Sequence, residues 1–325
     1  MLAVAEHLDT VNLPADRKAI EALLDRSEKS WAGEVPVVDR EFLFVLEDLE
    51  QKRIIGTSII YAQHGTKRAP HIFFRVETDE RYSTTLDRYF AHPTLRIGYN
   101  YNGPTEIGGL ILLPEYRRNT DSLGKALSYV RFLYMRMHRE LFRDHVLSEL
   151  LPPLETDGTS KLWDALGRHF TGLTYQEADR ISKDNKEFIN ALFPDDPIHT
   201  SLLPQDVREI IGQVGPDTKG VEKMLVRIGF EYGNQIDPFD GGPHFLATTN
   251  DITVVKEAKE VTVRAHDTEG KKWAILGLEQ AGTRPGFRAI SSRVTALESG
   301  VVGLTEDARR RLGVEDGQKL WLSYG

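Results

Sequence analysis

Hydrophobic and polar positions predict several strands in the first third of the chain. The segments "EFLFVLED" from residue 41, "RIIGTSIIYAQ" from 53 and "HIFFRVET" from 71 are rich in β-branched and aromatic residues, and polar or glycine-containing turns separate them. We expect these three strands to form an antiparallel meander. The almost continuous apolar run at 106–113, which ends at Pro114, predicts a fourth strand that is buried on both faces.

A long helix is predicted at residues 122–142, because apolar residues recur there at steps of three and four. The segment "HVLSEL" at 145–150 predicts a short fifth strand. Residues 152–214 indicate an irregular helical insertion whose pieces are separated by prolines. A further helix is expected to end at Gly229 and to lead into another strand.

The pattern becomes rich in strands beyond about residue 246. The segments "ITVVKEA", "EVTVRAHD", "KKWAILGLE", "FRAISSRV" and "KLWLSY" predict strands, and "TEDARRRLG" predicts one short helix. The sequence therefore predicts an α+β fold with two domains. Residues 1–245 would form a mixed, mostly antiparallel sheet with the helical insertion at about 152–214. Residues 246–325 would form a small β-barrel-like domain.

Composition restricts the function classes. The 325 residues are 40% hydrophobic and 28% charged, as in globular proteins, and the formal net charge is -8 with both signs mixed along the chain. A dominant nucleic-acid-binding surface is therefore not expected. The absence of cysteine excludes disulfides, thiolate metal sites and a cysteine nucleophile. No signal-peptide pattern opens the chain and no apolar run approaches the roughly 18 residues of a membrane helix, so we expect a soluble, cytoplasmic protein without membrane partners.

Residues 112–130, "LLPEYRRNTDSLGKALSYV", place two arginines and a polar loop between an apolar strand and a helix. The first turn of a helix has unpaired N–H groups and partial positive charge, so a diphosphate can bind there. Arg117 and Arg118 would add charge-assisted hydrogen bonds, and Gly124 would allow close approach of the backbone. The alternative is an ordinary helix start with solvated arginines.

The order of these elements resembles that of the GNAT acyltransferase superfamily. The resemblance implies that the buried strand presents backbone groups to the pantetheine arm of a coenzyme A thioester, and that the following turn holds the pyrophosphate. Under this resemblance the candidates for acyl-CoA binding are Leu110, Arg117, Arg118, Gly124, Lys125 and Ala126. The chain has Ser122 where the first loop glycine is expected, and Leu225 where an acid-donating tyrosine often stands.

Four segments carry a more specific signal: "PTLRIGYN…TEIGGLILLPEYR", "LWDALGRHF", "FPDDPIHTSLLPQDVREIIGQV" and "GFEYGNQIDPFDGGP". Together they resemble the arginine N-succinyltransferase family, which includes the subunits of arginine/ornithine succinyltransferase. The resemblance implies transfer of succinyl from succinyl-CoA, a co-substrate, to the α-amino group of arginine, with no permanently bound cofactor. It also implies a homodimer or a heterodimer with a paralogous subunit.

The chain departs from this family at one position that concerns catalysis. The family has "GQVHP", whose histidine is regarded as the proton donor, whereas this chain has "GQVGP" with Gly215. Two interpretations stay open. The protein is an arginine succinyltransferase or a relative that uses a different amine or acyl donor, or it is a catalytically altered member that serves as a partner subunit.

Acylation of an amine by a thioester needs a base for the ammonium group and donors for the developing oxyanion. Glu106 opens the buried strand and aligns with a family glutamate, so it is a candidate base, or else a strand-edge carboxylate. His199 and His244 could replace the missing histidine, or else be surface or packing residues. Asp237 and Asp240 could bind the guanidinium of arginine, or else cap a turn. The ten histidines form no H-E-x-x-H or comparable pair, so no metal site is expected.

Overall fold

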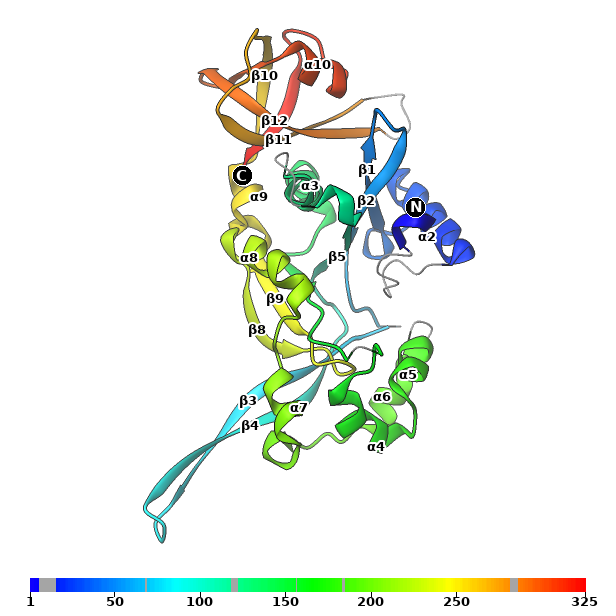
Figure 1. Ribbon diagram of the computed structural model, residues 1–325, viewed down its shortest axis with the longest axis vertical. Helices are drawn as coiled ribbons and strands as arrows, with labels where there is room; N and C mark the ends of the chain where they lie inside the picture. The colour runs from blue at the N-terminus through cyan, green and yellow to red at the C-terminus, as the bar shows by residue number, and fades with distance from the viewer. Residues whose placement is uncertain (6–15, 68, 118–121, 156, 183–184, 281–285) are drawn as a thin grey trace. The chain divides into compact units, whose positions relative to one another are not determined.

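The computed structural model describes residues 1–5, 16–67, 69–117, 122–155, 157–182, 185–280 and 286–325 (Figure 1). The chain divides into two compact units. The first unit comprises Met1–Ala62, Ile107–Asp144 and Thr248–Gly325, and the second comprises Gln63–Glu106 and His145–Ala247. The domain boundary expected near residue 245 stays a prediction.

The first unit begins with helices α1 (Leu2–Ala5) and α2 (Arg17–Trp31). Helix α2 begins where the Asp16 carboxylate accepts a hydrogen bond from the Ala19 N–H at 2.8 Å, which satisfies one of the unpaired donors of the first turn. The strands of this part are β1 (Glu41–Asp48) and its antiparallel partner β2 (Arg53–Tyr61), and β2 lies next to β5 (Thr105–Leu112). Helix α3 (Leu123–Met137) is fixed to β2, because the Ser58 hydroxyl donates to the Leu127 carbonyl at 2.8 Å.

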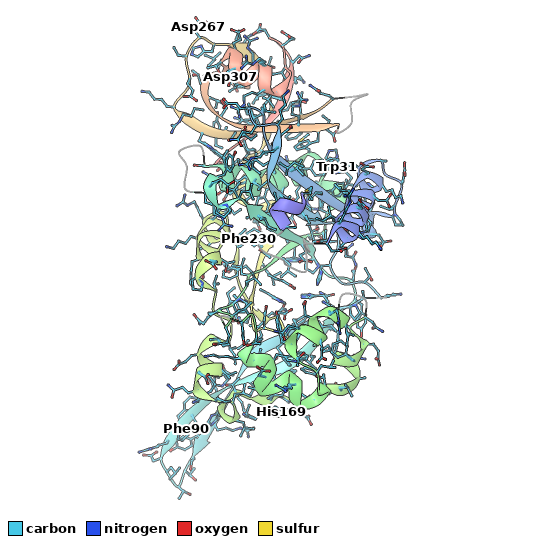
Figure 2. The ribbon with its side chains drawn as sticks, turned by 45° about the vertical axis from the view of Figure 1, so that its right-hand side comes forward. Trp31, Phe90, His169, Phe230, Asp267 and Asp307 are labelled. Carbon is cyan, nitrogen blue, oxygen red and sulfur yellow. The ribbon has the colours of Figure 1, made fainter. Side chains whose placement is uncertain are left out.

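Trp31, labelled in Figure 2, lies at the centre of an aromatic core that joins the elements of the first unit. The Trp31 ring centroid is 5.3 Å from that of Phe42, 4.7 Å from that of Tyr134 and 6.0 Å from that of Phe287. These side chains come from α2, β1, α3 and the C-terminal barrel. Aromatic pairs at such distances stabilise a fold beyond the burial of their surface.

The C-terminal barrel is closed in the strand order β10-β13-β12-β11-β14, with β10 and β13 parallel. Its strands are β10 (Lys259–Ala265), β11 (Lys272–Glu279), β12 (Phe287–Glu298), β13 (Val301–Leu304) and β14 (Lys319–Tyr324). Fully buried Val263, Leu276 and Leu322 lie in its core. Helix α9 (Thr253–Glu257) precedes the barrel, and α10 (Glu306–Leu312) lies between β13 and β14.

The strands of the second unit lie side by side in one sheet. Their order across it is β6 (His145–Glu149), β9 (Pro243–Thr248), β8 (Glu231–Ile236), β3 (His71–Ser83), β4 (Arg88–Asn100) and β7 (Ile198–His199). Strands β3 and β4 form a long antiparallel hairpin, from the pair His71 and Asn100 to the pair Ser83 and Arg88. The first residues of β5 pair in parallel with β6.

The helices of the second unit are α4 (Arg168–Thr171), α5 (Tyr175–Ser182), α6 (Glu187–Leu192), α7 (Gln205–Ile210) and α8 (Lys219–Arg227). Trp163 lies in the core of this unit, against which α5, α6 and α7 pack among these helices. The Trp163 ring stacks on Phe239 at 5.0 Å, and its N–H donates to the Leu173 carbonyl. This core holds the turn after β8, which carries several candidate site residues.

The structure confirms the α+β class, the mixed and mostly antiparallel pairing, and the C-terminal barrel. The predicted meander is wrong beyond β1 and β2, because β3 pairs with β4 and β8. Strand β4 was not predicted, and "ITVVKEA" contains helix α9 where a strand was expected. Within the described residues, no helix has the length and apolar character needed to cross a membrane.

Candidate active site

Glu106 and His64 form the first contact of the candidate active site. Glu106 is the second residue of β5, opposite Leu147 of β6, and only 5% of it is exposed. His64 follows β2, and its backbone N–H donates to the Pro104 carbonyl at 2.7 Å. The imidazole Nδ1 is 2.6 Å from Glu106 Oε2. Because Nδ1 donates to the carboxylate, the neutral ring carries its lone pair on Nε2, on the side away from Glu106.

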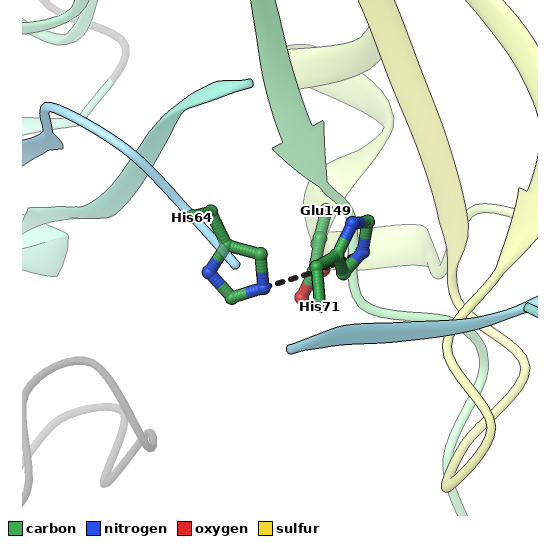
Figure 3. A group of neighbouring side chains, drawn as sticks. All are labelled: His64, His71 and Glu149. Atoms are coloured by element: carbon green, nitrogen blue, oxygen red, sulfur yellow. Dashed lines mark ion pairs between the residues drawn. The ribbon is translucent and has the colours of Figure 1, made fainter. Parts of the chain in front are cut away.

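Glu149, the last residue of β6, faces three histidines. Its Oε1 atom is 3.4 Å from His71 Nε2, 3.4 Å from His244 Nε2 and 4.0 Å from His64 Nε2. His71 begins β3 and His244 lies in β9, so four separate segments of the second unit supply these groups. Figure 3 shows His64, His71 and Glu149 together. We call His64, His71, His244 and Glu149 the histidine cluster.

Burial and neighbouring charges give the cluster unequal proton affinities. Burial lowers the pKa of His71, and it lowers the pKa of His244 to about 4. Burial also opposes protonation of His64, but the charge of Glu106, the hydrogen bond to it and the charge of Glu149 together raise the pKa of His64. Burial alone would raise the pKa of Glu149, yet the facing histidines hold it well below its usual range. The cluster therefore contains an ionised carboxylate among mostly neutral imidazoles.

Asp237 and Asp240 lie in the turn after β8, and both use oxygens to hold that turn. Asp237 Oδ1 accepts hydrogen bonds from the N–H groups of Phe239 at 2.7 Å and Asp240 at 3.2 Å. Asp240 Oδ1 accepts from the Gly242 N–H at 2.7 Å. Burial, with the charge of Glu149, raises the pKa of Asp237 to about 6; burial, with the charge of Asp237, raises the pKa of Asp240. Both carboxylates therefore cap this turn. A carboxylate oxygen of Asp237 also lies beside Glu149 and His244.

Gly215 and His199 differ from the cluster in their surroundings. The Gly215 N–H donates to the Leu151 carbonyl at 2.8 Å, and a Cβ at this position would lie 2.6 Å from the Pro152 carbonyl oxygen. The backbone therefore fills the space of any side chain here. His199 lies on β7 with its ring near that of His92 (centroids 6.4 Å apart). Glu106, by contrast, contacts His64 of the histidine cluster, and His244 contacts Glu149 of the same cluster.

The middle of β5 carries an irregular backbone. Gly109 adopts a φ of 56°, a left-handed conformation that favours glycine, and its Cβ would meet the Ile59 side chain at 2.8 Å. Its carbonyl accepts from the Thr57 hydroxyl at 3.0 Å, and the preceding carbonyl of Gly108 accepts from Arg131 at 3.3 Å. Arg131 is only 2% exposed, and burial lowers its pKa to about 9. These side chains fix the backbone that leads to Leu110, which is partly buried.

The predicted diphosphate residues have mixed environments. Arg117 Nε donates to the Leu112 carbonyl at 2.8 Å, and Arg118 lies outside the described residues. Gly124 and Ala126 belong to the first turn of α3, which has no side-chain cap. The Lys125 ammonium lies 4.2 Å from the Trp273 ring centroid, within the range of a cation–π contact.

Sequence reasoning missed His64, His71 and Glu149. Their separation along the chain matches no known motif. The available signal was a charged residue at the end of the short strand "HVLSEL", because β6 runs parallel to β5 and places Glu149 two residues beyond the partner of Glu106.

Comparison with known proteins identifies the family. Residues 1–254 match the family model described as arginine N-succinyltransferase beta subunit. An arginine N-succinyltransferase from Yersinia pestis is 33% identical over 315 residues, which cover 95% of this chain and 89% of that protein. One from Escherichia coli is 34% identical over 253 residues, 78% of this chain and 73% of that protein.

A solved structure gives the same result. The arginine/ornithine succinyltransferase subunit AI from Pseudomonas aeruginosa has a TM-score of 0.84 and 28% identity, over 99% of this chain and 94% of that chain. The GNAT-like fold expected from the sequence is therefore confirmed, and the chain belongs to the arginine N-succinyltransferase family of acyltransferases.

Proposed function

We propose that this protein transfers the succinyl group of succinyl-CoA to the α-amino group of arginine, and that the amine attacks the thioester directly. The observation that carries the mechanism is the buried Glu106 at the start of β5, held through Oε2 by His64 Nδ1 at 2.6 Å. A base positioned in this way removes a proton from a substrate ammonium without having to be reoriented in the transition state.

The proposed reaction balances as follows. Glu106 takes a proton from the ammonium, and the free amine forms a bond to the thioester carbon. The tetrahedral intermediate then collapses as the carbon–sulfur bond breaks, so coenzyme A leaves as a thiolate that takes up the remaining proton. No side-chain nucleophile is needed, which agrees with a chain that contains no cysteine.

The donor side is proposed on β5 and α3. The backbone at Leu110 would contact the pantetheine arm, beyond the irregular turn at Gly109. The first turn of α3, with Gly124, Lys125 and Ala126, would bind the diphosphate through backbone N–H groups and the positive end of the helix dipole. Arg117 would add a cation.

For the acceptor, Asp237 is the stronger of the two proposed guanidinium partners. One of its oxygens caps the turn, and a carboxylate oxygen faces Glu149. Asp240 is 9% exposed and holds Gly242, so its proposed role is to shape the turn around Asp237. We also propose that the chain works as a subunit of a dimer, because the Pseudomonas aeruginosa relative is described as a subunit. Light scattering of the purified chain tests this point.

A free-thiol release assay with succinyl-CoA, with and without arginine, tests the proposed function. We expect arginine-dependent release by the wild type and a loss of about 10²-fold or more in Glu106→Gln, the range typical of a general base. His169→Gln, a change at an exposed histidine of the same unit, should behave like the wild type. A folded wild type that binds succinyl-CoA in a calorimeter but releases no thiol would overturn the proposal and support the partner-subunit interpretation.

A further inference from the structure

We propose that His64, His71 and Glu149 form a binding site for a divalent transition-metal ion such as Zn²⁺, with His244 and Asp237 on the far side of Glu149. The site lies within the second unit, and it shares the contact between His64 and Glu106 with the proposed catalytic base. The proposal does not depend on arginine or succinyl-CoA being the substrates.

The spacing of the ligand atoms fits such an ion. Zn–N and Zn–O bonds of about 2.0–2.1 Å in tetrahedral geometry place neighbouring ligand atoms about 3.4 Å apart. Glu149 Oε1 is 3.4 Å from His71 Nε2, 3.4 Å from His244 Nε2 and 4.0 Å from His64 Nε2. The ligand atoms of His64, His71 and Glu149 all lie within 4.8 Å of one another. Small side-chain movements would close this set around one ion.

Glu106 gives His64 the orientation of a metal ligand. Histidines that bind metals usually donate their other ring N–H to a carboxylate or a carbonyl, which fixes the tautomer and strengthens the ligand. The 2.6 Å contact between His64 Nδ1 and Glu106 Oε2 has this arrangement, and it turns Nε2 toward the cluster. A carboxylate–histidine pair aimed at two further ligands is more specific than a group of acidic residues.

The cluster also contains buried nitrogen atoms without hydrogen bonds. In the part of the chain that the structure describes, His71 Nε2 and both ring nitrogens of His244 are buried and make none, and these residues are 3% and 0% exposed. A polar atom that is buried in this state destabilises the folded protein. A metal ion would use the imidazole lone pairs and remove much of this destabilisation.

Charge and access are consistent with a cation. Glu149 contributes a negative charge to the site, Glu106 another directly behind His64, and Lys186 is a nearby opposing cation. The side chains of His64 and Glu149 are 24% and 30% exposed, so the cluster lies near the surface of its unit, with the Nε2 atoms of His64 and His71 on its buried side. Imidazole and carboxylate ligands together suit Zn²⁺ and its first-row neighbours better than Mg²⁺ or Ca²⁺.

Direct binding to the full chain tests the site. After dialysis against a chelator, the protein is titrated with Zn²⁺ in competition with a chromophoric chelator, and with Co²⁺ while its visible absorption is recorded. We expect each chain to bind one ion tightly. The Co²⁺ complex should show the intense visible absorption of an ion with a low coordination number. His71→Gln and Glu149→Gln should weaken Zn²⁺ binding by at least 100-fold. Glu106→Gln should weaken it by 10- to 100-fold, as is usual for residues that hydrogen-bond to a metal ligand. The control His169→Gln should bind as the wild type does.

X-ray absorption of the zinc-loaded wild type keeps the test independent of how well the variants fold. It should show at least two imidazole ligands and one carboxylate ligand. A wild type that binds no stoichiometric Zn²⁺ at micromolar concentration overturns the proposal. So does binding that His71→Gln and His169→Gln reduce equally, or a spectrum without imidazole scattering.

Discussion

Glu106 Oε2 lies 2.6 Å from His64 Nδ1, so a candidate base and its orienting imidazole come from segments more than forty residues apart in the sequence. The consequence for catalysis depends on which of the two touches the substrate. In our proposal Glu106 does, and His64 acts through it.

We therefore expect His64→Gln to reduce kcat less than Glu106→Gln does, by about tenfold rather than about 10²-fold or more. A glutamine can still donate one hydrogen bond to Glu106, whereas Glu106→Gln removes the proton acceptor. KM for succinyl-CoA should stay unchanged in both variants, which steady-state kinetics will measure. Equal losses in the two variants would instead assign the proton transfer to His64.

Arg131 offers a test of the donor side. Arg131→Met removes the hydrogen bond to the Gly108 carbonyl and the two bonds to Ser128, so the irregular backbone of β5 loses an anchor. We expect KM for succinyl-CoA to rise about tenfold, which corresponds to about 1.4 kcal/mol. Arg136→Met, at an exposed position of the same helix, is the control. An unchanged KM in Arg131→Met would show that this anchor does not shape the donor site.

Gly215 gives a prediction about stability. In Gly215→Ala the new Cβ would lie 2.6 Å from the Pro152 carbonyl oxygen and 3.0 Å from that of Leu151, and neither backbone atom can rotate away. We expect a loss of about 1–3 kcal/mol in the free energy of unfolding, measured with urea. Gly220→Ala, in helix α8, meets no heavy atom within 4 Å and should stabilise the protein by about 0.5–1 kcal/mol. The same sign for both changes would contradict this account.

His244 makes stability depend on pH in the metal-free protein. Its pKa is about 4 in the folded state and near the ordinary 6.5 in the unfolded state. As the pH falls from about 6.5 to 4, only the unfolded chain gains this proton. The contribution of His244 to the free energy of unfolding is therefore complete above pH 6.5 and is lost toward pH 4. For a fully buried imidazole, this change in the free energy of unfolding is about 3 kcal/mol.

Asp237 acts in the opposite direction, because its pKa of about 6 favours the folded state at low pH. The measurement is therefore a difference: urea unfolding with chelator, from pH 4.5 to 8, of the wild type and His244→Gln. We expect the wild type to lose more stability than the variant as the pH falls below 6.5. Parallel curves would mean that His244 is protonated in the folded state.

The sequence predicted what depends on local pattern and on motif. Strands β1 and β2 and the barrel strands β10, β11, β12 and β14 are short segments with apolar and β-branched residues, and helix α3 has apolar residues at steps of three and four. Strand β4 was missed because much of the hairpin is solvent-exposed, so its apolar positions show little alternation. Helix α9 was predicted as a strand from its β-branched residues, but Val254 and Val255 are both buried, as neighbours on a packed helix can be and as alternating strand residues are not.

The candidate site was predictable only in part for a related reason. Glu106 and His244 were found because they adjoin motifs. The other cluster residues approach them only when strands distant in sequence have paired; these residues are His64, His71 and Glu149. No spacing along the chain predicts these contacts.

The close packing of Gly215 on Leu151 and Pro152 also limits how this chain can evolve or be engineered. The resemblance to the family led us to expect a histidine at 215, yet a single substitution cannot install one without displacing the neighbouring backbone. A histidine there would be tolerated only if the main chain at 151–152 moved away, because the atoms in its path are backbone carbonyls. The main chain around Gly215 thus restricts this position to glycine, and acid–base chemistry in this part of the fold is more accessible at other positions.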